Sequence, residues 1–222
     1  MNDLTLIIPA KNEKEALPIF LDEIKEYNYK KLIIIDTDDS ETENVIKKYE
    51  NIEIVVQKES GYGNALKEGI NKSKTKFCCI INADSSMHPK YLGEMFKLCK
   101  EKDFIFASRY LDGAGSEDDD FITFTGNKIF TFMGKILFGL KISDILFTYI
   151  LGRTESFKSL ELKYHDFRLC VEIPIKIERL SMTYASIPSY ERNRMGGKKK
   201  VNAFKDGFYI LVALITLFFK KK

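Results

Sequence analysis

Cys78-Cys79-Ile80-Ile81-Asn82-Ala83-Asp84-Ser85-Ser86-Met87-His88-Pro89 is the stretch that decides how this chain is interpreted. An apolar run stops at Asn82-Ala83-Asp84, and open α/β sheets bind ligands outside the carboxyl ends of such buried strands. Two oxygen-bearing side chains two residues apart on an extended segment point to the same side. They suit a hard divalent cation that carries a phosphorylated ligand. Alternatively, Ser85 or Ser86 caps a helix and Asp84 interacts with the helix dipole.

The composition is that of a folded protein with a substantial core. The 222 residues are 45% hydrophobic and 30% charged, which fits one large domain or one domain with an appendage. The four cysteines form no CxxC pair, and Cys78 and Cys79 lie in an apolar run, so we expect free, buried thiols and a reducing cytoplasm. Met1 to Pro9 is too short for a signal peptide.

The net charge of +3 is unevenly distributed. Residues 189–222 contain nine Lys or Arg and two acids, so the rest of the chain is mildly acidic. A basic tail favours an anionic partner such as a phosphate or an acidic lipid surface. Nucleic acid is not expected, because no stacking aromatics alternate with the basic residues. A solvated charged end is the simpler alternative.

Residues 4–81 alternate between strand and helix patterns. The run Leu4 to Pro9 has no polar alternation, which is typical of a strand buried on both faces. Three further strand-like runs alternate with helices in an order that predicts a mainly parallel sheet. Polar side chains follow these runs, and parallel strands place such ends on one edge. Converging acids are costly unless a cation or ligand joins them, so this edge predicts a metal-assisted nucleotide site. The polar residues are Asn12, Glu13, Asp36, Asp38, Asn82 and Asp84.

The second half of the chain contains more irregular patterns. Phe104 to Tyr110 predicts a strand, and the acidic, glycine-rich segment 111–120 predicts a mobile loop of the kind that often covers a site. Gly126 to Leu140 has the spacing of an amphipathic helix, whose aromatic surroundings fit either core or a lipid groove. Asp166 to Arg179 predicts a helix that Pro174 kinks or ends, and residues 183–188 predict an edge strand.

The C-terminal region combines a basic loop with an apolar run. Glu191 to Lys200 joins glycines to Arg and Lys, which suits wrapping a diphosphate. Phe208 to Phe219 is apolar except for Thr216; as a helix it spans about 18 Å, short of the ~30 Å hydrocarbon core. It therefore lies on a membrane surface or packs against the body or another subunit. We expect a domain at 1–200 and this short helical element at 201–222.

Several short motifs together resemble a known family. The chain resembles the family-two inverting glycosyltransferases, which have the GT-A nucleotide-sugar fold, and is most similar to the dolichol- or polyprenol-phosphate mannosyltransferase type. The resemblance extends from about residue 4 to 200 and implies a Rossmann-like α/β fold, with a mainly parallel central sheet between helices and a helical, basic C-terminal extension. The motifs are Ile8-Pro9-Ala10-Lys11-Asn12-Glu13, Ile35-Asp36-Thr37-Asp38, Gly61-Tyr62-Gly63-Asn64-Ala65-Leu66, Asn82-Ala83-Asp84, Ser108-Arg109-Tyr110 and Gly126-Asn127-Lys128.

The resemblance implies roles for individual residues. Asp84 is expected to be catalytic and to hold Mg²⁺ or Mn²⁺ on the sugar diphosphate. The acceptor residues would be Arg109, which is also expected to be catalytic, Asn127 and Lys128. The expected nucleotide-sugar-binding residues are Pro9, Ala10, Asn12, Glu13, Asp36, Asp38, Gly63, Asn82, Ala83, Arg192, Arg194 and Lys198.

The acceptor decides whether a base is needed. A polyprenyl phosphate oxygen is already anionic, whereas a saccharide hydroxyl must give its proton to a carboxylate. The candidate bases are Asp112, Glu117, Asp118 and Asp119, of which Asp112 is our catalytic candidate. We expect an enzyme that transfers a sugar to a polyprenyl phosphate at the cytoplasmic face of the membrane, as a peripheral protein. Transfer to a glycan, or a non-catalytic nucleotide-sugar-binding scaffold, is the alternative.

This sequence departs from the family's motifs at three positions. Asn82 stands where the family has a carboxylate, and Thr37 replaces an acid for which Asp38 is the expected substitute. His88 lies one residue later than the histidine of the polyprenol-phosphate type. The first departure keeps the scaffold alternative open, and the third leaves the acceptor open.

Overall fold

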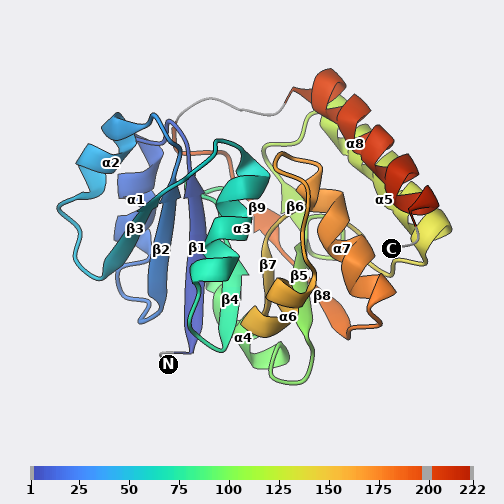
Figure 1. Ribbon diagram of the computed structural model, residues 1–222, viewed down its shortest axis with the longest axis horizontal. Coiled ribbons are helices and arrows are strands. Elements are labelled where there is room, and N and C mark those ends of the chain that lie inside the picture. Colours follow the sequence, from blue (N-terminus) through green and yellow to red (C-terminus); the bar gives the residue numbers. More distant parts are fainter. Residues whose placement is uncertain (1–2, 197–201, 221–222) are drawn as a thin grey trace.

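A seven-stranded sheet organises the protein, whose computed structural model describes residues 3–196 and 202–220. The strand order is β3-β2-β1-β4-β7-β5-β8, with helices on both faces (Figure 1). The strands of this sheet are β1 (Leu4–Ala10), β2 (Lys30–Ile35), β3 (Ile52–Val56), β4 (Phe77–Ile80), β5 (Phe104–Ser108), β7 (Ile150–Arg153) and β8 (Tyr184–Pro188).

The first four strands confirm the predicted parallel arrangement. β1 pairs in parallel with both β2 and β4, and β2 pairs in parallel with β3, so their carboxyl ends share one edge. β7 is antiparallel between β4 and β5, and β8 is the parallel edge strand predicted at residues 183–188. A second, two-stranded sheet joins β6 (Gly115–Ser116) to β9 (Tyr190–Glu191), within and beyond the predicted loop 111–120.

Helices cover both faces of the sheet because its strands are apolar on both sides. α1 (Ala16–Glu23), α2 (Ser40–Ile46) and α4 (Leu92–Leu98, after the short η1, Pro89–Tyr91) lie over one face. α3 (Tyr62–Lys72), α6 (Thr154–Ser159) and α7 (Leu169–Arg179) lie over the other. All four cysteines are buried and free, as expected from their positions.

Two helix predictions needed correction. α5 (Phe121–Phe138) begins five residues before the predicted Gly126, because Asp120 and Thr123 form a capping box, and ends at Gly139, whose φ is 76°. Pro174 lies inside α7 without ending it. Proline removes one helical hydrogen bond at a cost of about 3 kcal/mol, and burial of the surrounding apolar residues of α7 offsets that cost.

α8 (Ala203–Phe219) contains the predicted apolar run and packs on α5 and α7. Its buried residues Ile210, Ala213, Leu214 and Leu217 belong to the same apolar core as α3 and α7. Among residues 3–196 and 202–220, no helix is both long enough and apolar enough to cross a membrane.

The turn into α3 needs glycine because another segment lies against it. Gly61 has a φ of 131°, and a Cβ on Gly63 would lie 2.7 Å from the carbonyl oxygen of Tyr164. Asn64 N donates to His165 O at 3.2 Å across the same contact. The structure thus explains Gly63 by close backbone packing, and its predicted contact with the nucleotide sugar stays a prediction.

We expect Gly63→Ala to lower the free energy of unfolding by about 1–3 kcal/mol, because the new methyl group must displace backbone. Gly93→Ala is the matched control, since Gly93 lies in α4 with open space around its Cβ position. That control should stabilise the protein by about 0.5–1 kcal/mol through backbone entropy. Urea denaturation measures both, and equal effects of the two substitutions would contradict the packing role.

Candidate functional site

The loops after β1, β2 and β3 meet at the carboxyl edge of the sheet. Lys11 Nζ lies 3.1 Å from Asp36 Oδ2, and Ser60 Oγ donates to the same oxygen at 2.7 Å. Burial alone would raise the pKa of Asp36, but the hydrogen bonds from Ser60 and Lys11 outweigh it, so the pKa lies below its usual value. The buried Asp36 is therefore held as an anion among three loops, at the predicted edge.

Asp39, which is not among the predicted site residues, orders the first of these loops. One carboxylate oxygen accepts from Asn12 N at 2.5 Å, and the other accepts from Thr42 N at 3.1 Å as the N-cap of α2. Asn12 has a φ of 51°, and this contact holds it there. Asp38, the expected substitute for the missing acid, is instead exposed. The spacing from Asp39 to Thr42 is an N-cap signal that could have identified it.

The remaining predicted residues of the first loop lie beside these groups. Pro9 is half-buried and Ala10 is buried at the end of β1. Glu13 is 4% exposed, and its backbone N donates to Thr42 Oγ1 at 2.9 Å. The structure thus places all three at the same edge as Asp36.

The tip of β4 holds Asp84 with both carboxylate oxygens engaged. Oδ1 accepts from Ser86 N at 3.1 Å and from Ser86 Oγ at 2.7 Å, while Oδ2 accepts from Arg194 Nη2 at 2.6 Å. His88, rather than Ser85 or Ser86, is the N-cap of η1, so the capping alternative is wrong. Ser85 is buried with a φ of 63°, an uncommon conformation for a residue other than glycine.

Tyr62 links this tip to the turn before α3. Its hydroxyl donates to Asn82 Oδ1 at 3.3 Å and lies 2.6 Å from Thr148 Oγ1. The following Ala83 is buried. Since Ser60 of the same turn bonds Asp36, one turn bridges the tips of β2 and β4. The predicted groups are therefore brought together on one edge.

The segment that follows β9 lies along the Asp84 loop. Arg192 N donates to Ser86 O at 3.0 Å, and Met195 N donates to Asp84 O at 3.0 Å. The Arg192 guanidinium makes two 2.9 Å bonds to Glu23 of α1, which fix this segment to the body, while its buried Nε has no hydrogen-bond partner among residues 3–196 and 202–220. Lys198, the third predicted cation, lies outside the described residues.

Within the described part of the chain, Arg194 has two nitrogen atoms without a partner where Arg192 has one. The Nε and Nη1 atoms of Arg194 are buried and have no hydrogen-bond partner among residues 3–196 and 202–220. Buried polar groups in native proteins are normally paired. Two buried N–H donors on a cation at the ligand-binding edge of the sheet are therefore suited to an anionic ligand.

The oxygen groups fit a divalent ion only when it is shared with a ligand. The described parts of the chain contain no cluster of three or more His, Cys, Asp or Glu side chains able to hold a metal alone. Mg²⁺, however, typically binds one or two carboxylates together with substrate phosphates and water. Asp84, 6% exposed beside the amide of Asn82, fits that pattern.

Arg109 lies at the centre of a second charged group. Its guanidinium makes two bonds to the fully buried Asp144, at 2.8 and 3.0 Å, and approaches Glu191 at 3.0 Å and Asp119 at 3.4 Å. Burial alone would lower the pKa of Arg109, but Asp144 and Glu191 raise it well above its usual value. Arg109 is thus a cation held by three carboxylates, which changes its expected role as a free acceptor ligand.

Asn127 supports this group from α5. Its amide donates to Asp144 Oδ1 at 2.6 Å and to Tyr110 Oη at 3.3 Å, so it holds these two side chains, and its expected acceptor role stays a prediction. Lys128 is different: its Nζ lies 4.4 Å from the centre of the Tyr110 ring, with no carboxylate partner among the described residues. Of the three predicted acceptor residues, Lys128 alone keeps an uncompensated charge.

A cavity of about 330 Å³ lies beside Arg109 and Tyr110. It combines acidic and aromatic groups, and Phe121 and Phe124 at the start of α5 form an apolar part of its lining. Asp112, our candidate base, is exposed and does not line it, whereas Asp119 does. The full lining is Arg109, Tyr110, Gly115, Ser116, Asp119, Asp120, Phe121 and Phe124.

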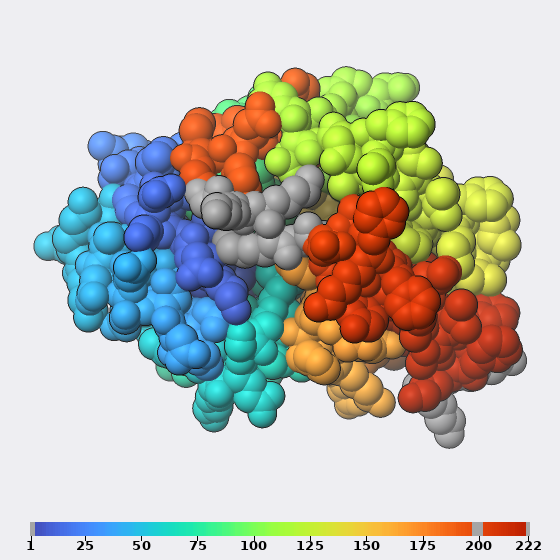
Figure 2. Space-filling model, turned by 90° about the horizontal axis from the view of Figure 1, so that it is seen from above, coloured from blue at the N-terminus to red at the C-terminus, as the bar shows by residue number. Residues whose placement is uncertain are grey.

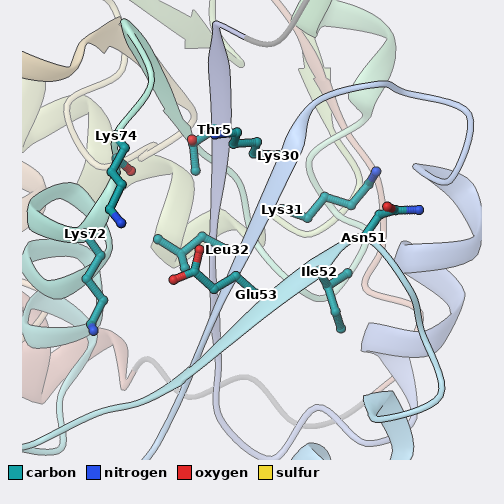
Figure 3. A pocket seen from close by; sticks show the side chains of 10 residues that line it. Thr5, Lys30, Lys31, Leu32, Asn51, Ile52, Glu53, Lys72 and Lys74 are labelled. Atoms are coloured by element: carbon teal, nitrogen blue, oxygen red, sulfur yellow. The ribbon is translucent and has the colours of Figure 1, made fainter.

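Another cavity, of about 230 Å³, lies at the opposite end of β1 and β2 (Figure 3). Lys30, Lys31, Lys72 and Lys74 line it, together with Glu53. Figure 3 shows Lys31 extending away from Lys72, and Lys31 Nζ donates to Tyr27 O at 3.0 Å. Parallel sheets bind ligands at the other end of their strands, so this cavity is not part of the site.

Comparison with known proteins identifies the family. The model of "Glycosyl transferase family 2" matches residues 5–161, which contain the tips of β1, β2 and β4. The chain belongs to this family. An uncharacterized glycosyltransferase of Mycobacterium tuberculosis is 31% identical over 100 residues, covering 45% of this chain and 44% of that protein. The chain thus spans less than half the length of such curated relatives.

A second relative, whose name states an activity, aligns with about half of this chain. The poly(ribitol-phosphate) beta-N-acetylglucosaminyltransferase TarP of Staphylococcus aureus is 28% identical over 127 residues, covering 52% of this chain and 39% of that protein. Family membership agrees with the predicted glycosyltransferase class, while the polyprenol-phosphate type stays a proposal.

Solved structures confirm the predicted fold. Glucosyl-3-phosphoglycerate synthase of M. tuberculosis, in complex with Mn²⁺, UDP and phosphoglyceric acid, aligns with a TM-score of 0.71 at 11% identity. The alignment covers 98% of this chain and 79% of that one. A mycobacterial protein aligns with a TM-score of 0.73, also at 11% identity, covering 97% and 74%.

Proposed function

We propose that this glycosyl transferase family 2 protein transfers a sugar, with inversion, from a nucleotide-diphosphate sugar to a polyprenyl phosphate. The observation that supports binding of the nucleotide-sugar donor is Arg194 beside Asp84 at the sheet edge: its buried Nε and Nη1 have no hydrogen-bond partner among the described residues. Asp36 and the first loop would hold the nucleoside at the neighbouring tips.

The departing nucleoside diphosphate must be stabilised as its negative charge grows. Asp84, with Asn82 beside it, would hold Mg²⁺ or Mn²⁺ against the diphosphate, and the bound ion would offset part of that charge. Arg194 would direct its free N–H groups at the same oxygens, where a preorganised donor in a partly dry site acts most strongly. Ser86 keeps the Asp84 carboxylate in one orientation.

A phosphate-bearing acceptor suits the cavity beside Arg109. Lys128, which has no carboxylate partner among the described residues, supplies a cation over the ring of Tyr110, which lines the cavity, while Phe121 and Phe124 give the cavity an apolar part. A phosphate oxygen that attacks the anomeric carbon needs no base, which agrees with the engagement of Asp119 by Tyr110 Oη at 2.5 Å. The phosphoglyceric acid bound by the structural neighbour supports a phosphate-bearing acceptor in this fold.

A saccharide hydroxyl is the second candidate acceptor, favoured by one observation. Asp119 lines the cavity and could take a proton if Tyr110 turned away, whereas the exposed Asp112 would first have to move into the cavity. The resemblance to a polymer N-acetylglucosaminyltransferase points the same way.

Radiolabelled transfer assays separate these acceptors. Purified protein with Mn²⁺ and a panel of nucleotide sugars is incubated with polyprenyl phosphate or with oligosaccharides. We expect label in the lipid extract. Label only in the saccharide would replace the proposed acceptor, and binding of nucleotide sugar without transfer to either would favour a scaffold.

Arg194→Gln tests the proposed binding of the nucleotide-sugar donor at a residue other than Asp84. Removing this cation should lower kcat by about 10²–10³-fold, the range typical of losing one preorganised donor at a developing charge. Arg168→Gln is the matched control, because Arg168, the N-cap of α7, pairs with Asp166 and stacks on the rings of Tyr164 and Tyr209 without contacting Asp84, so its loss should leave turnover unchanged. Steady-state kinetics at saturating donor measure both variants. Unaltered turnover in Arg194→Gln would contradict the proposed role of Arg194.

A further inference from the structure

α8 is apolar on the side that faces away from the core as well as on the side that faces it. Phe204, Phe208, Val212, Ile215 and Phe219 recur at helical spacing opposite the buried residues, and all five are exposed. Phe204 and Phe219 are each 78% exposed. A helix that is apolar all round normally has apolar surroundings on both sides.

α5 lies beside α8 and continues the same surface (Figures 1 and 2). Phe138 and Phe218 form an edge contact at 6.1 Å, and Phe130 approaches Gly207, so the two helices run in parallel. The exposed apolar residues of both helices form what we call the α5–α8 face: Phe121, Ile122, Ile129, Phe132, Ile136, Phe204, Phe208, Val212, Ile215 and Phe219.

Lysines border this face. Lys128 and Lys135 lie next to the exposed Phe132 of α5, at i−4 and i+3, and Lys205 and Lys220 lie on the side of α8 away from α5, by helical spacing. The described acids nearest in sequence are Asp120 and Asp206. Both are engaged with backbone N–H groups at the starts of the helices.

We propose that the α5–α8 face binds the surface of an acidic lipid bilayer, a proposal that rests on the proposed lipid-phosphate acceptor. An apolar stripe bordered by lysines matches acyl chains below and anionic headgroups at the sides. A second copy of this chain fits less well, because a two-fold interface would bring these lysines toward lysines. The seventeen residues of α8 span about 26 Å and would lie along the membrane plane.

The position of the acceptor cavity agrees with this orientation. Phe121 belongs to the α5–α8 face and also lines the cavity beside Arg109, while Lys128 borders the same end of α5. A lipid phosphate could therefore reach the cavity while its hydrocarbon tail stays at the α5–α8 face.

Vesicle binding tests this proposal directly. The full chain is sedimented with vesicles of phosphatidylcholine alone or with phosphatidylglycerol added, and we expect at least tenfold stronger binding to the acidic vesicles. Phe208→Glu combined with Phe132→Glu should reduce that binding at least tenfold. Ile19→Glu, an exposed apolar position on α1, is the matched control and should bind like the wild type.

Two further measurements separate this inference from the proposed function. Thermal shift with nucleoside diphosphate and Mn²⁺ should be the same in the double variant as in the wild type, which shows an intact fold and donor site. Transfer to lipid by a wild-type protein that does not bind acidic vesicles would overturn the membrane inference alone. Vesicle binding without transfer would overturn the proposed function alone. A wild-type dimer that the double variant converts to a monomer, without vesicle binding, would identify the α5–α8 face as a self-association surface.

Discussion

Replacing Asp84 by Asn should reduce turnover by at least 10²-fold while leaving the fold intact. The amide keeps the size of the side chain and can still accept from Ser86, but it loses the charge that pairs with Arg194 and would hold the divalent ion. Electrostatic groups at a developing charge typically contribute 10²–10³-fold to kcat. Steady-state transfer assays over a range of Mn²⁺ concentrations measure the effect.

Glu41→Gln is the matched control for this experiment. Glu41 follows β2 in the first turn of α2 and loses the same charge, yet its side chain is 72% exposed in a surface pair with Lys14. We expect a change of less than about threefold, as for a charge in a solvated position. Similar losses in both variants would indicate a general effect of edge charge and contradict a specific role of Asp84.

Replacing Arg109 by Gln should lower the free energy of unfolding by about 3–5 kcal/mol, because it leaves the buried Asp144 carboxylate without its cation. Asp144 is fully buried as a side chain, and Glu191 and Asp119 share the same guanidinium. Chemical denaturation of the purified variant measures the change.

Two further variants serve as controls for this loss of stability: Lys158→Gln and Asp144→Asn. Lys158 forms a surface pair with Glu155 at 2.9 Å, so its removal should change stability little. Combining Arg109→Gln with Asp144→Asn removes the unpaired charge and should recover part of the lost stability. An Arg109→Gln variant as stable as the wild type, with weakened acceptor binding, would restore Arg109 to the acceptor role first expected of it.

The donor edge could be predicted from sequence because its residues follow apolar runs directly. The runs of β1, β2 and β4 are buried on both faces, as is typical of parallel strands, and the next polar residues must lie at the shared edge. This reasoning correctly placed Asp36 and Asp84 at one edge, at the tips of β2 and β4 on either side of β1. It selected Asp38 where Asp39 orders the loop, since it weighed charge without the N-cap spacing to Thr42.

The contacts that fix individual arginines could not be predicted in this way. Arg192 pairs with Glu23, which is 169 residues away in the sequence, and Arg109 pairs with Glu191, which is 82 residues away. Nothing local distinguishes Arg192 from Arg194. Among the described residues, however, the first makes two bonds to Glu23 and leaves only Nε without a partner, while the second leaves both Nε and Nη1. Such pairings depend on which elements become neighbours, and this is decided by the packing of α1 and β9 against the sheet.

Titration of nucleoside diphosphates into the wild type and Asp84→Ala, each with and without Mn²⁺, tests the central claim most directly. The claim is that the tips of β2 and β4, with Arg194, form a site where a divalent ion joins the protein to a diphosphate. We predict that Mn²⁺ strengthens binding at least tenfold in the wild type and has no effect in Asp84→Ala. Equal strengthening by Mn²⁺ in both proteins, or no binding to either, would contradict it.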